Sequence, residues 1–252
     1  MIRQGLTEEV GTIFKMMKEQ GIQADVATFT IVLDGSLSQL DEQSSEKQVE
    51  TVMRVLSEME AAGIEANMET YGKMMYLLLR EGDRARDSVK AVLAHIWGKG
   101  LELSSHIYTI LVEHYFSREP PDLDAVRDLI QSRGLVNKSG TTDLVFWERV
   151  IKGYAHAGDT ASAMDIFERI DSFGAAVTLS TLEVLLRALV HFREAEQAQK
   201  LVDTVLSHRD RFMSDTTGNT DSRFWRHGFW GFAMDNGLVR ESLLRDSRSN
   251  VE

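Results

Sequence analysis

Apolar residues recur every three or four positions along most of this chain, a spacing that predicts amphipathic helices. Residues 143–178 carry the pattern most clearly. A first apolar stripe begins at Trp147, a Gly158-Asp159 break follows, and a second stripe runs on to Gly174. This segment therefore predicts two helices joined by a short turn.

The same two-helix unit recurs along the chain. A large apolar residue opens a helix at six places, with spacings of 42, 37, 39, 35 and 43 residues: Phe29, Tyr71, Tyr108, Trp147, Leu182 and Trp225. A glycine suited to left-handed backbone closes several second helices: Gly21, Gly63, Gly100 and Gly174. Two helices per period predict an all-α fold, an α-solenoid built as a right-handed superhelix of helix-turn-helix repeats. Solenoids mostly bind rather than catalyse.

Helix and loop signals divide the chain into a half repeat, about five repeats and a C-terminal capping segment. The boundaries are 6–25, then 26–67, 68–104, 105–143, 144–178 and 179–221, then 222–252. The predicted helices are 6–20, 26–37, 45–62, 68–80, 84–98, 105–117, 121–133, 144–157, 159–172, 179–192 and 194–208, with a short terminal helix around 238–246. Because residues 6–20 resemble the second helix of a repeat, we expect the chain to be the C-terminal part of a longer protein.

The amino-acid composition and the absence of known catalytic motifs exclude several kinds of functional site. The 252 residues include no cysteine, which excludes disulfides, thiol nucleophiles and cysteine-bound zinc. The seven histidines form no His-x-x-x-His pair, and no phosphate-binding loop or nucleophile elbow is found. We therefore expect no enzyme, no metal or other cofactor and no small-molecule substrate. No apolar run approaches the roughly 18 residues of a membrane span.

The formal net charge is −11, whereas a surface that holds phosphates is normally basic. Two interpretations stay open at this point. Either the acidic residues make the whole surface negatively charged, or they lie apart from a less acidic face that binds the partner.

Four segments resemble the pentatricopeptide repeat family: ATFTIVLDG (27–35), ETYGKMMYLL (69–78), HIYTILVEHY (106–115) and FWERVIKGYAHAGDTASAMDIFERIDSFG (146–174). The tetratricopeptide repeat has a similar period, but its Trp…Leu-Gly…Tyr signature is not found. The resemblance implies a non-catalytic adaptor that binds single-stranded RNA. It also implies a mitochondrial or plastid location, and we expect a mitochondrial role in RNA processing, stability or translation.

Members of this family read about one RNA base per repeat. The resemblance assigns the reading to the residue after the opening aromatic and to the last residue of the repeat. Thr30 with Asn67 resembles an adenine reader, and Thr109 with Asp143 resembles a guanine reader. The other repeats depart from the pattern, with Gly72 opposite Ser104, Glu148 opposite Thr178, and Glu183 without a clear partner.

Further RNA contacts are implied by position in the repeat. Val145 matches the small apolar residue that flanks a base, and Arg80 matches a cation for the RNA backbone. Lys152 and Arg187 face the same way by helical spacing. They also lie four residues after Glu148 and Glu183, so they alternatively form helix-stabilising ion pairs.

A protein-binding scaffold is the alternative function, such as a factor associated with the mitochondrial ribosome or with respiratory-complex assembly. The acidic charge and the irregular repeats favour it. In the segment FWRHGFWGF (224–232), we predict that Trp225, Phe229 and Phe232 are buried. Phe224 and Trp230 either pack on the terminal helix or form an exposed aromatic patch for a partner.

Overall fold

The computed structural model describes residues 16, 19–21, 25–37, 45–133, 143–213 and 221–240. All of its regular structure within these residues is helical, and the chain divides into two compact units, 1–111 and 112–252. The predicted all-α solenoid of helix-turn-helix repeats is confirmed. The predicted helices at 6–20 and 238–246 lie mostly outside the described residues, and residues 238–240 are described but not helical. The polar segments 38–44, 134–142 and 214–220 also lie outside the described residues.

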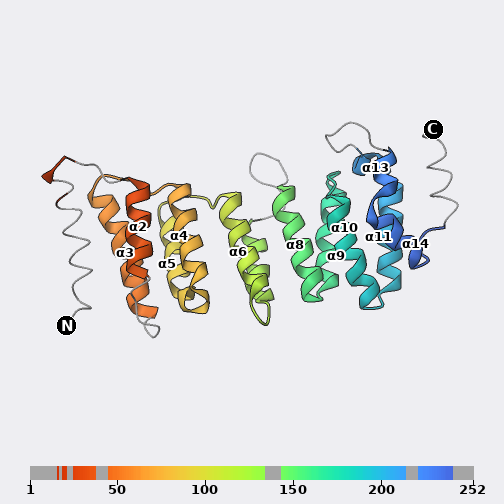
Figure 1. Cartoon of the computed structure of the whole chain (residues 1–252), viewed down its shortest axis with the longest axis horizontal. Coiled ribbons are helices and arrows are strands. Elements are labelled where there is room, and N and C mark those ends of the chain that lie inside the picture. Colours follow the sequence, from red (N-terminus) through yellow and green to blue (C-terminus); the bar gives the residue numbers. More distant parts are fainter. Residues whose placement is uncertain are drawn as a thin grey trace. The chain divides into compact units, whose positions relative to one another are not determined.

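The first unit is a stack of helical hairpins (Figure 1). It contains α2 (Val26–Leu37), α3 (Ser45–Ala61), α4 (Met68–Arg80), the 3-10 turn η1 (Gly82–Ala85), α5 (Arg86–Gly98) and the start of α6 (Ser105–Ser117). Helix α2 packs against α3 and α4, and α5 packs against α3 and α4. The first helices of successive hairpins therefore form one layer, and the second helices form another.

The second unit repeats this arrangement. It contains the rest of α6, then α7 (Leu123–Arg133), α8 (Leu144–Ala157), α9 (Thr160–Ser172), α10 (Leu179–His191), α11 (Ala195–Ser207), α12 (Arg209–Met213), α13 (Asp221–Arg226) and α14 (Gly228–Asp235). Helix α10 lies between α8 and α14 and also packs against α9 and α11. We call α2, α4, α6, α8 and α10 the first helices, and α3, α5, α7, α9 and α11 the second helices.

The residues that open the first helices supply much of the core. Phe29, Tyr71, Trp147 and Leu182 are all buried, and Tyr108 is half-buried. Each is the fourth residue of its repeat, so the same position of every first helix contributes to the core. Burial of such a side chain contributes about 1.5–3 kcal/mol. The period read from these residues is thus the period of core contacts.

The glycines that close the second helices have the predicted backbone. Gly63, Gly100 and Gly174 have positive φ angles of 75°, 68° and 76°. At the first of them, the amide of Ile64 returns to the carbonyl of Met59 at 2.9 Å, which satisfies an otherwise free helix carbonyl. These residues turn the chain sharply toward the next first helix.

The C-terminal segment differs from the expectation. Trp225 was expected to open a sixth first helix, but it lies in the short helix α13. The helix that packs against α10 in the next first-helix position is α14, which begins at Gly228. The polar segment 214–220 lengthens this repeat, so the next first-helix position comes later in the sequence than Trp225. The spacing of 43 residues from Leu182 to Trp225 resembled the other spacings and therefore did not reveal the shift.

Candidate nucleic-acid interface

The residue before each first helix caps that helix. Its side chain accepts a hydrogen bond from a backbone N–H in the first turn, as expected for an N-cap. The capping residues of the five first helices are Asp25, Asn67, Ser104, Asp143 and Thr178, and His227 caps α14 in the same way. These positions include the predicted second reader of each repeat. The reader side chains are therefore oriented by the helix that follows them.

Asn67 shows what this orientation does. Its Oδ1 atom accepts from the amide of Thr70 at 2.9 Å and from the Thr70 hydroxyl at 3.1 Å. The amide of Asn67 in turn donates to the Thr70 hydroxyl at 3.3 Å, which completes a capping box. Because Oδ1 is held by the helix, the Nδ2 group with its two donors is directed away from it, on an exposed residue. Its predicted partner Thr30 is half-buried on α2.

Asp143 is held more tightly. One carboxylate oxygen accepts from the amide of Phe146 at 3.1 Å, and the other accepts from the Arg133 guanidinium at 2.5 Å. The Arg133 side chain is only 10% exposed and also lies 4.4 Å from the centre of the Phe146 ring. A base that binds Asp143 therefore competes with Arg133.

Thr109, the predicted partner of Asp143, belongs to the first unit, whereas Asp143 belongs to the second. The Thr109 hydroxyl donates to the carbonyl of Ser105 at 2.9 Å, one turn earlier in α6. Val145, the predicted flanking residue, is 64% exposed at the start of α8. An aliphatic side chain this exposed is free to contact a base.

The three predicted phosphate ligands have different surroundings. Arg80 binds Asp34 of the neighbouring α2 at 2.7 Å. Arg187 makes the alternative helical pair, with its Nε and a terminal nitrogen 3.0 and 2.7 Å from Oε1 of Glu183. Lys152 makes no ion pair with Glu148 or any other residue that the structure describes. Glu148 instead accepts a hydrogen bond at 2.5 Å from the amide of Thr178.

Ion pairs of this exposed kind are weak, about 0.2–1 kcal/mol each. In the pair of Arg80 and Asp34, the side chains are 52% and 46% exposed. A phosphate can replace such a carboxylate at little cost in free energy.

The acidic net charge is not carried by the first helices. Within their bounds they hold five carboxylates and five Lys or Arg residues: Asp34, Glu69, Glu113, Glu148 and Glu183 against Lys73, Arg80, Arg149, Lys152 and Arg187. The first-helix layer is thus formally neutral, although the whole chain carries −11. The prediction that charge is segregated by layer fits this distribution.

Ion pairs also neutralise individual carboxylates of the first helices. Arg149 of α8 forms an ion pair with Glu113 of α6. Within α4, a hydrogen bond from the Lys73 ammonium, 2.8 Å away, holds the pKa of Glu69 below its ordinary value. Such contacts mask carboxylates that would otherwise repel an RNA backbone.

The partner of Glu183 could not be found from the sequence. In the structure it is His227, the N-cap of α14, whose Nδ1 lies 3.7 Å from Oε2 of Glu183. Gly228 also approaches this carboxylate, since an added Cβ would lie 2.8 Å from Oε2. The only sequence signal was the aromatic run after His227, and the insertion at 214–220 hid its register.

Most aromatic side chains of residues 224–232 are buried in the core and do not form an exposed patch. Phe224, Trp225, Phe229 and Trp230 are all buried and their rings contact one another at centroid distances of 4.9–5.1 Å. The expectation for Phe232 was wrong. It is half-buried, and the Arg187 guanidinium lies 4.4 Å from its ring centre, because α13 and α14 are separate helices with different faces.

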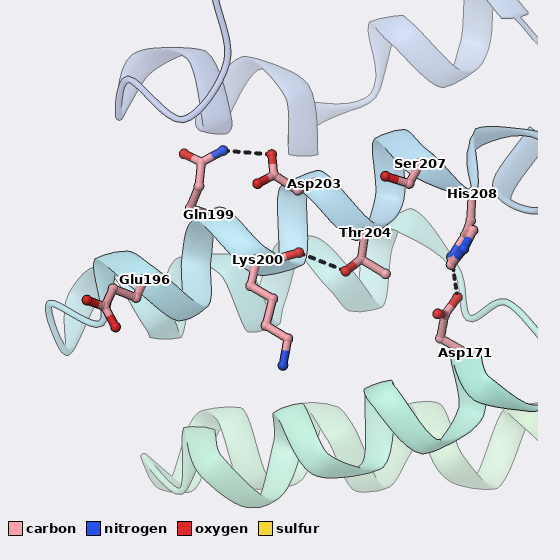
Figure 2. Close-up of a pocket in the computed structure, with 8 residues that line it drawn as sticks. All are labelled: Asp171, Glu196, Gln199, Lys200, Asp203, Thr204, Ser207 and His208. Atoms are coloured by element: carbon pink, nitrogen blue, oxygen red, sulfur yellow. Dashed lines mark hydrogen bonds and ion pairs between the residues drawn. The ribbon is translucent and has the colours of Figure 1, made fainter.

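A pocket of about 700 Å³ runs along α11 in the second-helix layer (Figure 2). Its polar side chains are largely engaged with one another or with neighbours. Gln199 donates to Asp203 at 2.9 Å, His208 lies 2.9 Å from Asp171, and Lys200 binds Glu168 at 2.7 Å. No group of three or more His, Asp or Glu side chains among the described residues could hold a metal ion. No described helix is long and apolar enough to cross a membrane.

Comparison with known proteins identifies the repeats. A family model described as a pentatricopeptide repeat domain matches residues 12–78, and a second model, the PPR repeat, matches residues 145–174. No curated protein sequence matches the chain.

One solved structure supports the fold. The crystal structure of the pentatricopeptide repeat protein PPR10 from maize is similar with a TM-score of 0.51 at 15% identity, over 98% of this chain and 38% of that one. The PPR domain of Arabidopsis thaliana protein-only RNase P 1, in complex with tRNA, has a TM-score of 0.48 at 13% identity, over 82% of this chain and 98% of that one. The chain thus spans well under half of the PPR10 structure. Residues 12–78 and 145–174 thus match the pentatricopeptide repeat, and the capped helical hairpins of the described residues have the fold of such repeats.

Proposed function

We propose that this protein binds single-stranded RNA along its first-helix layer and acts as a non-catalytic adaptor in mitochondrial RNA processing, stability or translation. The family reads single-stranded RNA with side chains of successive repeats. The observation that carries the proposal is the capping of each first helix by the residue in the reader position. That geometry presents the free donors of Asn67 to a base at no further cost in side-chain ordering.

The charge distribution supports the same face. An RNA backbone approaching the first helices meets formally neutral helices, with exposed cations at Arg80 and Arg187. Lys152 adds a cation that pairs with none of the described residues. The five second helices carry an excess of carboxylates: α3, α5, α7, α9 and α11 together have 12 Asp or Glu residues against eight Lys or Arg residues. Electrostatics therefore favour the first-helix layer over the second.

Fluorescence anisotropy with a labelled pool of random single-stranded RNA tests the proposal. The test variant replaces Arg80, Lys152 and Arg187 by Ala. The matched control replaces Lys99, Arg169 and Lys200 by Ala, which removes the same charge from exposed positions on or next to second helices. Binding that depends on the first helices loses about two units of slope in log Kd against log salt concentration in the test variant only.

Two outcomes oppose the proposal. Equal loss in both variants places the RNA elsewhere or makes the binding nonspecific. Failure of the unmodified chain to bind RNA at low salt removes the RNA function. It leaves the protein-binding scaffold, whose partner is then sought by affinity purification from mitochondria.

A further inference from the structure

The second repeat presents an aromatic side chain that the fold does not use. Tyr76 of α4 is 62% exposed, whereas Phe29, Tyr71 and Trp147 of the same layer are buried. Its phenol makes no hydrogen bond, ion pair or ring contact with any residue that the structure describes. Both the ring and the hydroxyl of Tyr76 are therefore accessible to a binding partner.

Hydrogen-bonded base reading is absent from the same repeat. Gly72, in the first reader position, has no side chain, and the hydroxyl of Ser104, in the second, caps α6 by accepting from the amide of Ile107 at 3.3 Å. The imidazole of His106 covers the glycine, since a Cβ added to Gly72 would lie 3.5 Å from its Cδ2 atom. His106 is itself exposed. The rings of Tyr76 and His106 thus lie near Gly72, a reader position that has no side chain to bind a base.

Tyr76 lies on the same face of α4 as Gly72, one turn further along, because residues four apart stack on a helix. Its neighbours on that face are Lys73 and Arg80, whose side chains are 43% and 52% exposed. On the adjacent α2, Ile31 is 72% exposed and lies one turn before Asp34, the residue that binds Arg80. In the 42-residue register that aligns Phe29 with Tyr71, Ile31 matches Lys73, so it lies about one helical turn nearer the N-terminal end of the layer than Tyr76.

We infer that Tyr76 is a stacking platform for one nucleobase, with His106 and Ile31 about one turn nearer the N-terminal end of the layer and Lys73 and Arg80 as contacts for the adjacent phosphates. This inference rests on the proposed RNA function. A base presents a flat face of the right size to the phenol ring, and the two cations match the charge of its backbone. Since stacking does not depend on the pattern of donors and acceptors, the second repeat holds a base without selecting it.

The experiment measures anisotropy with labelled oligouridine and oligoadenosine of equal length. Tyr76→Ala weakens binding about five- to 100-fold for both sequences, the range for loss of one stacked base. Tyr76→Phe and Tyr76→Trp retain binding because they keep a flat ring. Trp97→Ala is the matched control. It removes another exposed aromatic, 56% exposed on the second helix α5 of the same unit, and leaves binding unchanged.

The outcomes separate this inference from the proposed function. If the unmodified chain binds RNA and Tyr76→Ala binds equally well, the stacking site is wrong while the RNA function stands. If Tyr76→Phe is as weak as Tyr76→Ala, the hydroxyl and not the ring makes the contact, which also overturns stacking. If the unmodified chain binds neither oligonucleotide at low salt, the RNA function itself fails. Crosslinking of RNA containing 5-iodouridine to Tyr76 would support the site directly.

Discussion

The backbone of Gly153 in α8 lies directly against the ring of Phe116 in α6. A Cβ atom added to Gly153 would lie 2.2 Å from two carbon atoms of that ring. The ring is also held from the side by Tyr154, at a centroid distance of 5.2 Å and nearly perpendicular. The approach of these two first helices is therefore set by the absence of one side chain.

Gly153→Ala is expected to destabilise the second unit by about 1–3 kcal/mol, because the methyl group forces the helices or the ring to move. Gly231→Ala is the control, since this residue lies in α14 of the same unit with nothing within 4 Å of an added Cβ. The control is expected to gain about 0.5–1 kcal/mol from helix propensity. Urea unfolding of both variants checks the difference, and equal stabilities would contradict the close packing.

Arg193, which follows α10, has a left-handed backbone with φ of 62°, the one described residue other than glycine with a positive φ. Arg193→Gly removes about 1–2 kcal/mol of backbone strain from the folded state. Glycine also gives the unfolded chain more conformational entropy, which offsets part of the gain in stability. We expect a net stabilisation of about 0.5–1 kcal/mol. Arg193→Ala keeps the Cβ atom and the strain, and should melt at the temperature of the unmodified chain. A melting temperature raised equally by both changes would assign the effect to the side chain instead.

Burial raises the pKa of Tyr154 to about 12. In the unfolded chain this phenol ionises near pH 10, so above that pH the unfolded state loses a proton that the folded state keeps. Stability is therefore complete below about pH 10 and falls between about pH 10 and 12, by about 1.4 kcal/mol at pH 11. Free energies of unfolding from pH 8 to 12 should show this loss in the unmodified chain and its absence in Tyr154→Phe. Identical alkaline slopes in the two proteins would rule it out.

Asn67 combines a cap with a predicted base contact, and substitutions separate the two. Asn67→Asp keeps a cap of equal strength, so stability should change by no more than a few tenths of a kcal/mol. With Thr30 it then resembles the guanine reader, so the preferred base at one RNA position should move from adenine to guanine, by roughly tenfold for one hydrogen bond. Asn67→Ala should lose about 1 kcal/mol of stability as well as the preference.

Selection from a random RNA pool measures the preference, and thermal unfolding measures the cap. An unchanged preferred sequence for Asn67→Asp would exclude Asn67 as a reader, whatever its role in the helix.

The contact of Asp143 with Arg133 predicts a structural effect. Asp143→Asn keeps the cap but removes one carboxylate partner of the mostly buried guanidinium, at a cost of about 1–3 kcal/mol. Asp143→Ala adds about 1 kcal/mol for the lost cap. Asp124→Asn serves as control, because Asp124 is 91% exposed although it lies 2.6 Å from Arg127. Its loss should cost less than about 0.5 kcal/mol, and a cost equal to that of Asp143→Asn would show that burial of Arg133 has no effect.

The sequence by itself determined the helices and their caps. Apolar spacing placed α8 at 144–157, as observed, and glycine at 63, 100 and 174 fixed left-handed helix ends, because these signals are local. The reader positions were assigned by the resemblance to the pentatricopeptide repeat and stay a prediction. Where an insertion broke the period, local signals could not restore it, and the sequence placed the next first helix at Trp225 instead of Gly228.

Only the tertiary structure decided which side chains are exposed and unoccupied by ion pairs, and so able to contact a ligand. It joined Asp143 to Arg133, paired Arg80 with Asp34, and brought His227 to Glu183 across an interruption in the repeat. It also buried the Trp225 and Trp230 rings while leaving Tyr76 exposed, although all three are aromatic residues in apolar helices. Exposure and pairing depend on which helix packs against which. That arrangement arises from contacts between residues distant in sequence, and no periodicity within one repeat contains it.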